Sequence, residues 1–221
     1  MSRSIDSHIE GLRELLFRMG GRAEAILDKA LRAVWERDVR LAEEVLTDDV
    51  EIDRIEVDID AAVLKALALQ APVAEDLREV LAIKMIATDL ERVGDLARNV
   101  AKIARRLSVQ SALTLPATAT TLARAAQGAL RRALDAFSRS DPALARVVLG
   151  EDDVIDRVQD EVVETMLREL GKHPESASQE VDVIMLAKHL ERVGDHATNI
   201  AEDVILVAEA RNVKHAAKLA R

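Results

Sequence analysis

Hydrophobic positions recur every three or four residues over almost the whole chain, which is the period of one face of an α-helix. Only 4 prolines and 8 glycines interrupt 221 residues, so the helices between them must be long. Asp38 and Asp141 each follow a long amphipathic run and are predicted N-caps. Pro72 and Pro174 are predicted to begin further helices. The pattern predicts six helices, at residues 5–36, 39–69, 73–108, 117–139, 142–171 and 175–210.

One five-residue sequence, Glu-Arg-Val-Gly-Asp, occurs twice, at residues 91–95 and 191–195, and each copy is followed four positions later by Asn99 or Asn199. Internal repetition of this kind sets the architecture of a chain. We therefore expect an all-α fold of two tandem, pseudo-symmetric three-helix bundles. The Ser- and Thr-rich segment 108–121 is the expected connection between them. The predicted boundaries are 1–110 for the first bundle and 111–221 for the second.

The repeated sequence places acidic residues along one face of a helix. At about 100° per residue, Glu91, Asp95 and Asn99 lie one above the other, while the apolar residues Leu90 and Val93 lie on the opposite side. The sixth helix repeats this arrangement with Glu191, Asp195 and Asn199.

The preceding helix of each half carries its own pair of aspartates, Asp49 and Asp53 in the first half. In an antiparallel hairpin, residues equally distant from the loop lie at the same height. The midpoint between this pair and Glu91 with Asp95 is Pro72, in the predicted loop. In the second half the corresponding midpoint falls between His173 and Pro174. Each hairpin therefore brings two acidic pairs level with each other.

Four carboxylates at one place repel one another unless a cation or protons compensate. Oxygen ligands favour hard cations such as Mg²⁺, Mn²⁺ or iron, with Zn²⁺ also possible. We therefore expect one cation site in each bundle. The candidate metal ligands are Asp49, Asp53, Glu91 and Asp95 in the first site, and Asp152, Asp156, Glu191 and Asp195 in the second. The candidates to support a bound ion are Asn99, Asn199, Arg92, Arg192 and His196.

Each of these features also has a simpler interpretation. With 40 acidic residues in 221, a single acidic i, i+4 pair is typical of a solvated helix face. Arg92 and Arg192 can form ion pairs along their own helices. Gly94 and Gly194 cost about 1 kcal/mol each in a helix interior. They permit either a close helix crossing or room for a ligand beside the carboxylates.

Composition excludes several classes of function. A net charge of −9 argues against a nucleic-acid-binding protein, which needs a basic surface. The chain has no cysteine, which excludes disulfides and thiolate metal sites and is compatible with the cytoplasm. No apolar run approaches the roughly 20 residues that span a bilayer. These features together lead us to expect a cytoplasmic protein. The sequence contains no nucleophile with a neighbouring base and no glycine-rich phosphate loop, so we expect that the protein is not an enzyme.

Several longer segments resemble the PhoU family, the phosphate-specific transport system accessory proteins. The resemblance extends over nearly the whole chain. The matching segments are Met19-Gly20, residues 70–78 around Pro72, residues 90–101 and residues 190–202. The resemblance implies a pair of three-helix bundles that bind metal, often multinuclear, through Glu/Asp-x-x-x-Asp motifs. It implies a negative regulator of the phosphate-starvation response that also restrains phosphate uptake. The implied partners are the ATPase subunit of a phosphate ABC transporter and a sensor histidine kinase, with the membrane reached only through them. A homodimer is also implied.

Two alternatives to this function remain, and the two sites are expected to differ. The acidic faces could bind basic partner surfaces without metal, in a purely structural helical interaction module. A metal-dependent phosphohydrolase would also need an open coordination site in a shaped pocket. Thr198 and Glu202 stand where the first half has Arg98 and Lys102. The second site is therefore expected to hold metal more tightly than the first.

Overall fold

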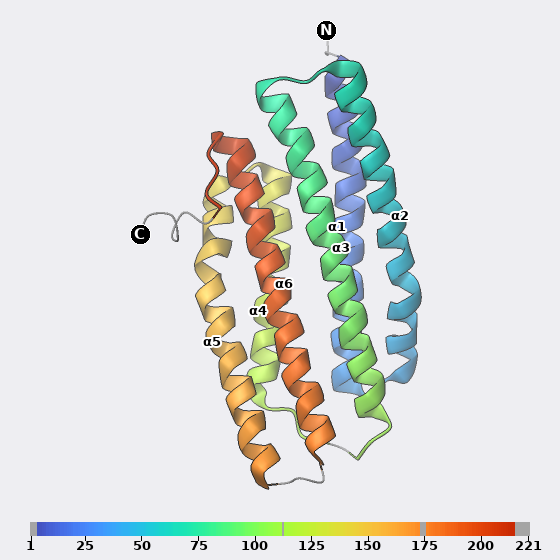
Figure 1. Cartoon of the computed structure of the whole chain (residues 1–221), viewed down its shortest axis with the longest axis vertical. Coiled ribbons are helices and arrows are strands. Elements are labelled where there is room, and N and C mark those ends of the chain that lie inside the picture. Colours follow the sequence, from blue (N-terminus) through green and yellow to red (C-terminus); the bar gives the residue numbers. More distant parts are fainter. Residues whose placement is uncertain (1–3, 112, 173–175, 215–221) are drawn as a thin grey trace.

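The structure is a computed structural model that describes residues 4–111, 113–172 and 176–214. Within these ranges it consists of six long α-helices and their short connections (Figure 1). Each helix begins and ends within two residues of its predicted bounds, whereas the predicted loop at His173 and Pro174 lies outside the described residues. The helices are α1 (Ser4–Glu36), α2 (Val39–Gln70), α3 (Ala74–Ser108), α4 (Ala117–Arg139), α5 (Pro142–Lys172) and α6 (Ala177–Glu209).

The helices form two three-helix bundles that lie side by side. Helices α1, α2 and α3 pack against one another, as do α4, α5 and α6, and α3 packs along α6 between the two groups. Figure 1 shows α3 and α6 running in opposite directions at this junction. The all-α fold of two repeats is thus as predicted, while the boundary between residues 110 and 111 stays a prediction.

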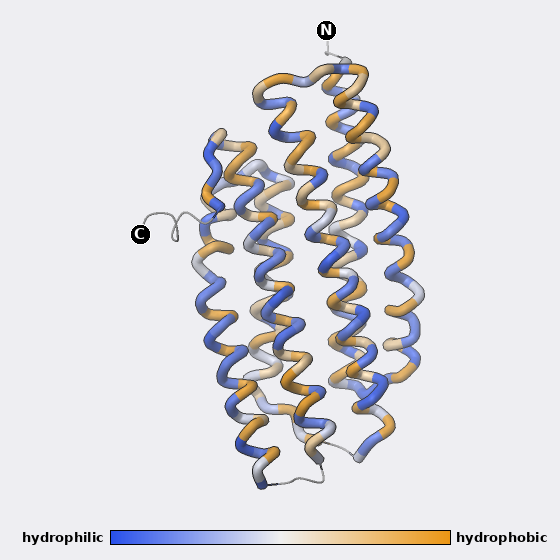
Figure 2. Tube along the Cα trace, viewed as in Figure 1, coloured by the Kyte–Doolittle hydropathy of each residue, from blue (hydrophilic) through white to orange (hydrophobic). Residues whose placement is uncertain are grey.

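One continuous apolar core runs through both bundles, built mainly from Leu, Ile, Val and Ala side chains. Alanines such as Ala87, Ala97 and Ala101 of α3 are fully buried, and their small side chains let neighbouring helices approach closely. Figure 2 shows hydrophobic and hydrophilic residues alternating within the turns of each helix. This is the amphipathic pattern from which the helices were predicted. None of the helices in the described ranges has an apolar stretch sufficient to cross a membrane.

The two predicted N-caps are confirmed. The Asp38 carboxylate accepts hydrogen bonds from the backbone N–H groups of Arg40 at 2.8 Å and Leu41 at 3.2 Å. The Asp141 carboxylate accepts from Ala143 at 2.9 Å and Leu144 at 3.0 Å. These bonds satisfy N–H groups that have no partner inside the helix, so they fix where α2 and α5 begin.

Polar side chains join the two bundles at the end where α1 and α3 finish and α4 and α6 begin (Figure 1). Arg106, near the end of α3, donates from Nε to both carboxylate oxygens of Asp182, near the start of α6, at 2.9 and 3.1 Å. Trp35 of α1 donates to the Thr120 hydroxyl of α4 at 3.0 Å. Because a guanidinium fork matches a carboxylate in direction as well as charge, the Arg106–Asp182 pair also fixes the register of α3 on α6.

The segment after α6 folds back onto the second bundle through a buried acid. Asp203 is completely buried, and the Lys214 ammonium lies 2.9 Å from its Oδ1 atom. Burial raises the pKa of Asp203 to about 6, and the carboxylates of Asp89 and Glu202 add to the rise while Lys214 opposes it. The charged form of Asp203 is therefore only partly compensated in the folded chain.

We predict that Asp203→Asn changes the pH dependence of stability. The folded chain holds the Asp203 proton more tightly than the unfolded chain, so this group stabilises the fold below about pH 4. That stabilisation is lost as the pH rises through about 6. The asparagine variant should gain about 3 kcal/mol over the parent protein between pH 4 and pH 7, in free energies of unfolding from urea titrations. The same difference at both pH values would contradict the prediction.

Candidate functional site

Two sets of four carboxylates occupy equivalent places in the two bundles, each contributed by the second and third helix of its bundle. The first cluster comprises Asp49 and Asp53 of α2 with Glu91 and Asp95 of α3. The second cluster comprises Asp152 and Asp156 of α5 with Glu191 and Asp195 of α6. In each case both helices place their acidic stripe along the crossing between them.

The first cluster contains a deeply buried carboxylate. Asp49 is only 3% exposed, whereas Asp53 on the same helix is exposed. The pKa of Asp49 is raised to about 6, chiefly by burial and also by Asp53 and Asp95, against the opposing effect of Arg98. Burial and then Asp95 also raise the pKa of Glu91, with Asp53 among the smaller causes. The four carboxylates thus lie close enough to act on one another electrostatically.

Arg98 supplies positive charge inside the first cluster. Its Nε atom lies 3.2 Å from Oδ2 of Asp49, and its Nη1 atom lies 3.2 Å from Oδ1 of Asp95. One guanidinium therefore bridges a carboxylate of α2 and a carboxylate of α3. Because a metal ion would bind the same oxygen atoms, Arg98 competes directly with a cation at this place.

Among the described residues, no cation bridges the carboxylates of the second cluster as Arg98 does in the first. Thr198 replaces Arg98, and its hydroxyl donates to Asp152 Oδ1 at 3.2 Å. Burial and then the Asp152 carboxylate raise the pKa values of Asp156 and Asp195. Burial and then Asp195 raise the pKa of Glu191. A raised carboxyl pKa marks a charged form that lacks compensation, and three of the four carboxyl groups of the second cluster show it, although the largest rise is that of Asp49 in the first cluster.

The repeated glycine is explained by the helix crossing in both bundles. A Cβ atom on Gly94 would lie 2.7 Å from Asp49 Oδ1 and 3.3 Å from Ile52 Cδ1. A Cβ atom on Gly194 would lie 2.9 Å from Cδ1 of Ile155, the residue equivalent to Ile52. Close crossing is therefore common to both copies, whereas space beside a carboxylate is needed only at Gly94.

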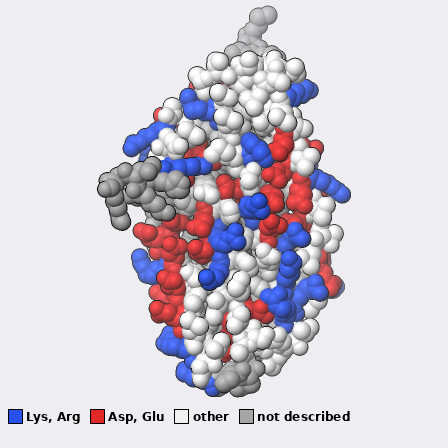
Figure 3. Space-filling model, viewed as in Figure 1, with Lys and Arg blue, Asp and Glu red and all other residues white. Residues whose placement is uncertain are grey.

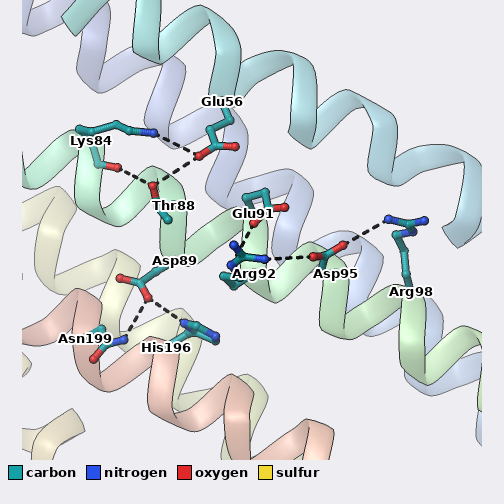
Figure 4. A network of polar contacts seen from close by, with 10 residues as sticks. All are labelled: Glu56, Lys84, Thr88, Asp89, Glu91, Arg92, Asp95, Arg98, His196 and Asn199. Carbon is teal, nitrogen blue, oxygen red and sulfur yellow. Dashed lines mark hydrogen bonds and ion pairs between the residues drawn. The ribbon is translucent and has the colours of Figure 1, made fainter.

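The residues predicted to support a bound ion behave differently in the two halves. His196 Nδ1 lies 2.7 Å from Oδ1 of Asp89, and Asn199 donates to the same oxygen at 3.0 Å (Figure 4). These contacts cross from α6 to α3, so both side chains join the bundles. Asn99 instead accepts a hydrogen bond from Lys102 at 3.2 Å. Asp89 was not among the predicted residues, because the sequence period does not show which flank of α3 meets α6.

Other charges around the first cluster are paired along and between helices. Arg92 lies 3.5 Å from both Glu91 and Asp95, as the simpler interpretation of this residue predicts (Figure 4). Glu56 continues the acidic face of α2, but its Oε1 atom receives Lys84 at 3.2 Å and the Thr88 hydroxyl at 3.4 Å. Glu56 therefore already has donors and is a weaker ligand candidate than the four predicted residues. No ion pair of Arg192 is found among the described residues.

The donor set of both clusters suits a hard cation, because it consists of carboxylate oxygens. Among the described residues, however, no group of three or more Asp, Glu or His side chains is arranged to hold a metal ion. The structure thus brings the predicted residues together on each helix pair without gathering them into a coordination shell. A metal would have to draw the side chains inward, and in the first cluster it would also have to displace Arg98.

We predict that Gly94→Ala and Gly194→Ala destabilise the protein by about 1–3 kcal/mol each, because the added methyl group overpacks a helix crossing. Gly94→Ala should cost more, since it also displaces Asp49 from Arg98. The control is Gly150→Ala in α5, where nothing lies within 4 Å of the new Cβ atom. That variant should gain up to about 1 kcal/mol from helix propensity. Thermal and urea unfolding measure all three, and a gain at Gly94 or Gly194 would refute the crossing explanation.

Comparison with known proteins places the chain in a family. The PhoU domain model matches it twice, at residues 16–104 and 119–204. A PhoU homologue of Zymomonas mobilis, a phosphate-specific transport system accessory protein, is 32% identical over 96% of this chain and 89% of its own length. One from Xylella fastidiosa is 35% identical over 93% of this chain and 86% of its own.

Solved structures agree with this assignment. The crystal structure of PhoU from Pseudomonas aeruginosa superposes with a TM-score of 0.90 at 32% identity, covering 94% of this chain and 100% of that one. PhoU from Streptococcus pneumoniae has a TM-score of 0.88 at 24% identity over 95% and 99% of the two chains, which shows the same fold. The family consists of accessory and regulatory proteins without enzymatic activity. With both repeats matched and the fold shared over nearly its whole length, the chain belongs to the PhoU family.

Proposed function

We propose that this protein is a negative regulator of the phosphate-starvation response and a modulator of phosphate uptake. In this proposal it acts in the cytoplasm, as a homodimer, as an adaptor between the ATPase subunit of a phosphate ABC transporter and a sensor histidine kinase. Membership of a family of phosphate transport accessory proteins supports this role. The all-helical surface, which offers long faces for other proteins, is in keeping with an adaptor.

We propose further that the adaptor binds divalent or trivalent hard metal ions at its two carboxylate clusters. The observation that carries this proposal is the second cluster, where burial and then the repulsion between carboxylates raise the pKa values of Asp156, Glu191 and Asp195. Fe, Mg²⁺, Mn²⁺ or Zn²⁺ would supply positive charge there, and carboxylates can bridge two ions in a multinuclear site. The protein's contribution is to hold two helices so that their carboxylates share a cation.

The second candidate is a helical interaction module that works without metal. The first cluster favours it, because Arg98 already places one positive charge between Asp49 and Asp95 there. An exposed acidic face could then meet a basic partner surface directly. The two candidates differ in what a metal titration should show.

We predict that exchanging Arg98 and Thr198 exchanges the affinities of the clusters. Mn²⁺ binding is measured by electron paramagnetic resonance and calorimetry, with one cluster silenced by Asp→Asn at Asp53 and Asp95 or at Asp156 and Asp195. The second cluster should bind more tightly in the parent protein. Arg98→Thr should strengthen the first cluster about tenfold and Thr198→Arg should weaken the second about tenfold, because one competing charge is removed or added.

The control for this exchange is Arg131→Thr on α4, which removes the same charge from a side chain that is 74% exposed. It should leave both affinities unchanged. Tighter binding by the first cluster in the parent protein would overturn the predicted order. Absence of bound metal, together with a melting temperature that metal does not change, would support the metal-free module instead.

The regulatory role is tested in cells by deleting the gene and following a phosphate-starvation reporter at high phosphate. We predict that the reporter is switched on and that the parent gene switches it off again. A gene carrying Asp156→Asn and Asp195→Asn should fail to restore repression if metal at the second cluster is needed. Full repression by this variant would separate regulation from metal binding, and a reporter that stays off in the deletion strain would count against the regulatory proposal.

A further inference from the structure

A basic groove lies at the junction of α2 and α3, away from both carboxylate clusters. We call it the α3 basic groove; its volume is about 460 Å³. All of its positively charged side chains come from the last turns of α3, and the first residues of α2 form the opposite wall of the groove. It is lined by Val39, Glu43, Lys102, Arg105, Arg106 and Val109. Three positive side chains face one carboxylate, in a protein whose net charge is −9.

The cations of this groove are incompletely neutralised. Arg106 is paired with Asp182, and Lys102 donates only to the neutral side chain of Asn99. In the part of the chain that the structure describes, Arg105 has no hydrogen-bond or ion-pair partner. The Glu43 side chain likewise pairs with none of the three cations among the described residues. Two positive charges, on Lys102 and Arg105, therefore remain available to a ligand.

The end of a helix does not by itself account for this charge. Arginine in the last turn favourably meets the negative end of the helix dipole, and α3 has Arg105 and Arg106 there. The equivalent helix α6, however, ends at Glu209 without any basic residue in its last turn. The dipole therefore explains part of the positive charge at the end of α3 but does not require it.

The second bundle has the opposite charge at the equivalent place. Glu202 stands where the first bundle has Lys102, and Ile205 and Leu206 stand where it has the two arginines. The cation that replaces Glu43 is Arg146, and it is bound to the Glu209 carboxylate at 2.6 Å. The same fold thus forms an acidic surface, with its Arg146 paired, in one copy and an under-neutralised basic groove in the other.

The positive field of the groove extends toward α6. Burial lowers the pKa of His189, and the nearby charges of Arg192, Arg106 and Lys102 lower it further. Figure 3 shows Lys and Arg side chains gathered over the lower part of α3, while Asp and Glu side chains form separate groups elsewhere on the same face. The positive charges of Lys102 and Arg106 on α3 and of Arg192 on α6 therefore contribute to one region of positive potential.

We propose that the α3 basic groove binds a phosphate group, either free or carried by a nucleotide. A phosphate dianion matches the two available charges of Lys102 and Arg105, and the guanidinium fork can bond two of its oxygens. The volume lies within the range of small-molecule sites and leaves space beyond one phosphate. Val39 and Val109 offer apolar contact to a group that carries the phosphate. This site is separate from the metal clusters and does not depend on the proposed metal binding.

The test is calorimetric titration of the full chain with inorganic phosphate and, separately, with ATP. The protein is first freed of metal on a chelating resin, so that no ion in the carboxylate clusters can hold the phosphate. We expect saturable binding that Lys102→Gln and Arg105→Gln each weaken by about tenfold. Glu43→Gln should strengthen it several-fold, because it removes the one carboxylate that faces the ligand.

Arg131→Gln on α4 is the matched control, since it removes one exposed charge elsewhere and should leave the affinity unchanged. Binding of both ligands shows that the phosphate group alone is recognised, and binding of ATP alone identifies a nucleotide as the source. Both results support the proposal. Lack of saturable binding of either ligand overturns it, as does equal binding by the parent protein and Arg105→Gln. Because Arg105 is exposed and unpaired, this variant should keep the melting temperature of the parent.

Discussion

The antiparallel packing of α3 on α6 is the contact on which the whole molecule depends. Each of these helices is the third of its own bundle and also makes the most extensive contact with the other bundle, to which α1 and α4 add a smaller one. Arg106–Asp182 near one end and Asp89 with His196 and Asn199 farther along hold this register. A helix fixed on several sides cannot rotate freely. The carboxylates on its remaining face therefore keep their positions relative to α2 or α5.

The duplicated halves share a backbone and differ in how they balance charge. Apolar and glycine positions are equivalent, since Gly94 and Gly194 cross Ile52 and Ile155. The polar positions have diverged, because Arg98 brings a positive charge into the first cluster, whereas Thr198 brings only a hydroxyl into the second. Packing restricts the apolar and glycine positions in both copies, whereas a charged residue on the surface can change without cost to the fold. Function in such a protein is expected where two equivalent positions differ.

The sequence predicted the helices well because the signals are local. A period of 3.6 residues, the capping aspartates Asp38 and Asp141, and the low number of prolines act within a few residues of each helix end. The repeat then gave the two bundles. The pairing of bundles through Asp89 could not be predicted in this way, because hydrophobic period shows that a face is buried but not which helix covers it.

The carboxylate residues of the candidate site could be predicted from the sequence, but the degree to which their charge is compensated could not. Spacing along two helices placed the carboxylates of each cluster together. The extent to which Arg98 enters the first cluster depends on a side-chain conformation that spacing cannot give. Asn99 and Asn199 show the same limit, since identical residues in a repeated motif bond to different partners. Repetition in sequence therefore predicts equivalent backbone positions and leaves the contacts of each copy open.

The antiparallel junction has a consequence for recognition. Two equivalent bundles joined through oppositely directed third helices are related by an approximate half-turn, so a surface with identical halves could be bound equally well in two opposite orientations. Arg98 against Thr198, and Lys102 against Glu202, remove that ambiguity, because a partner meets different charges after the half-turn. A few differences between equivalent residues thus make the two orientations of a bound partner distinguishable. The adaptor role proposed above would require such a distinction, because the protein would face one partner on one side and a different partner on the other.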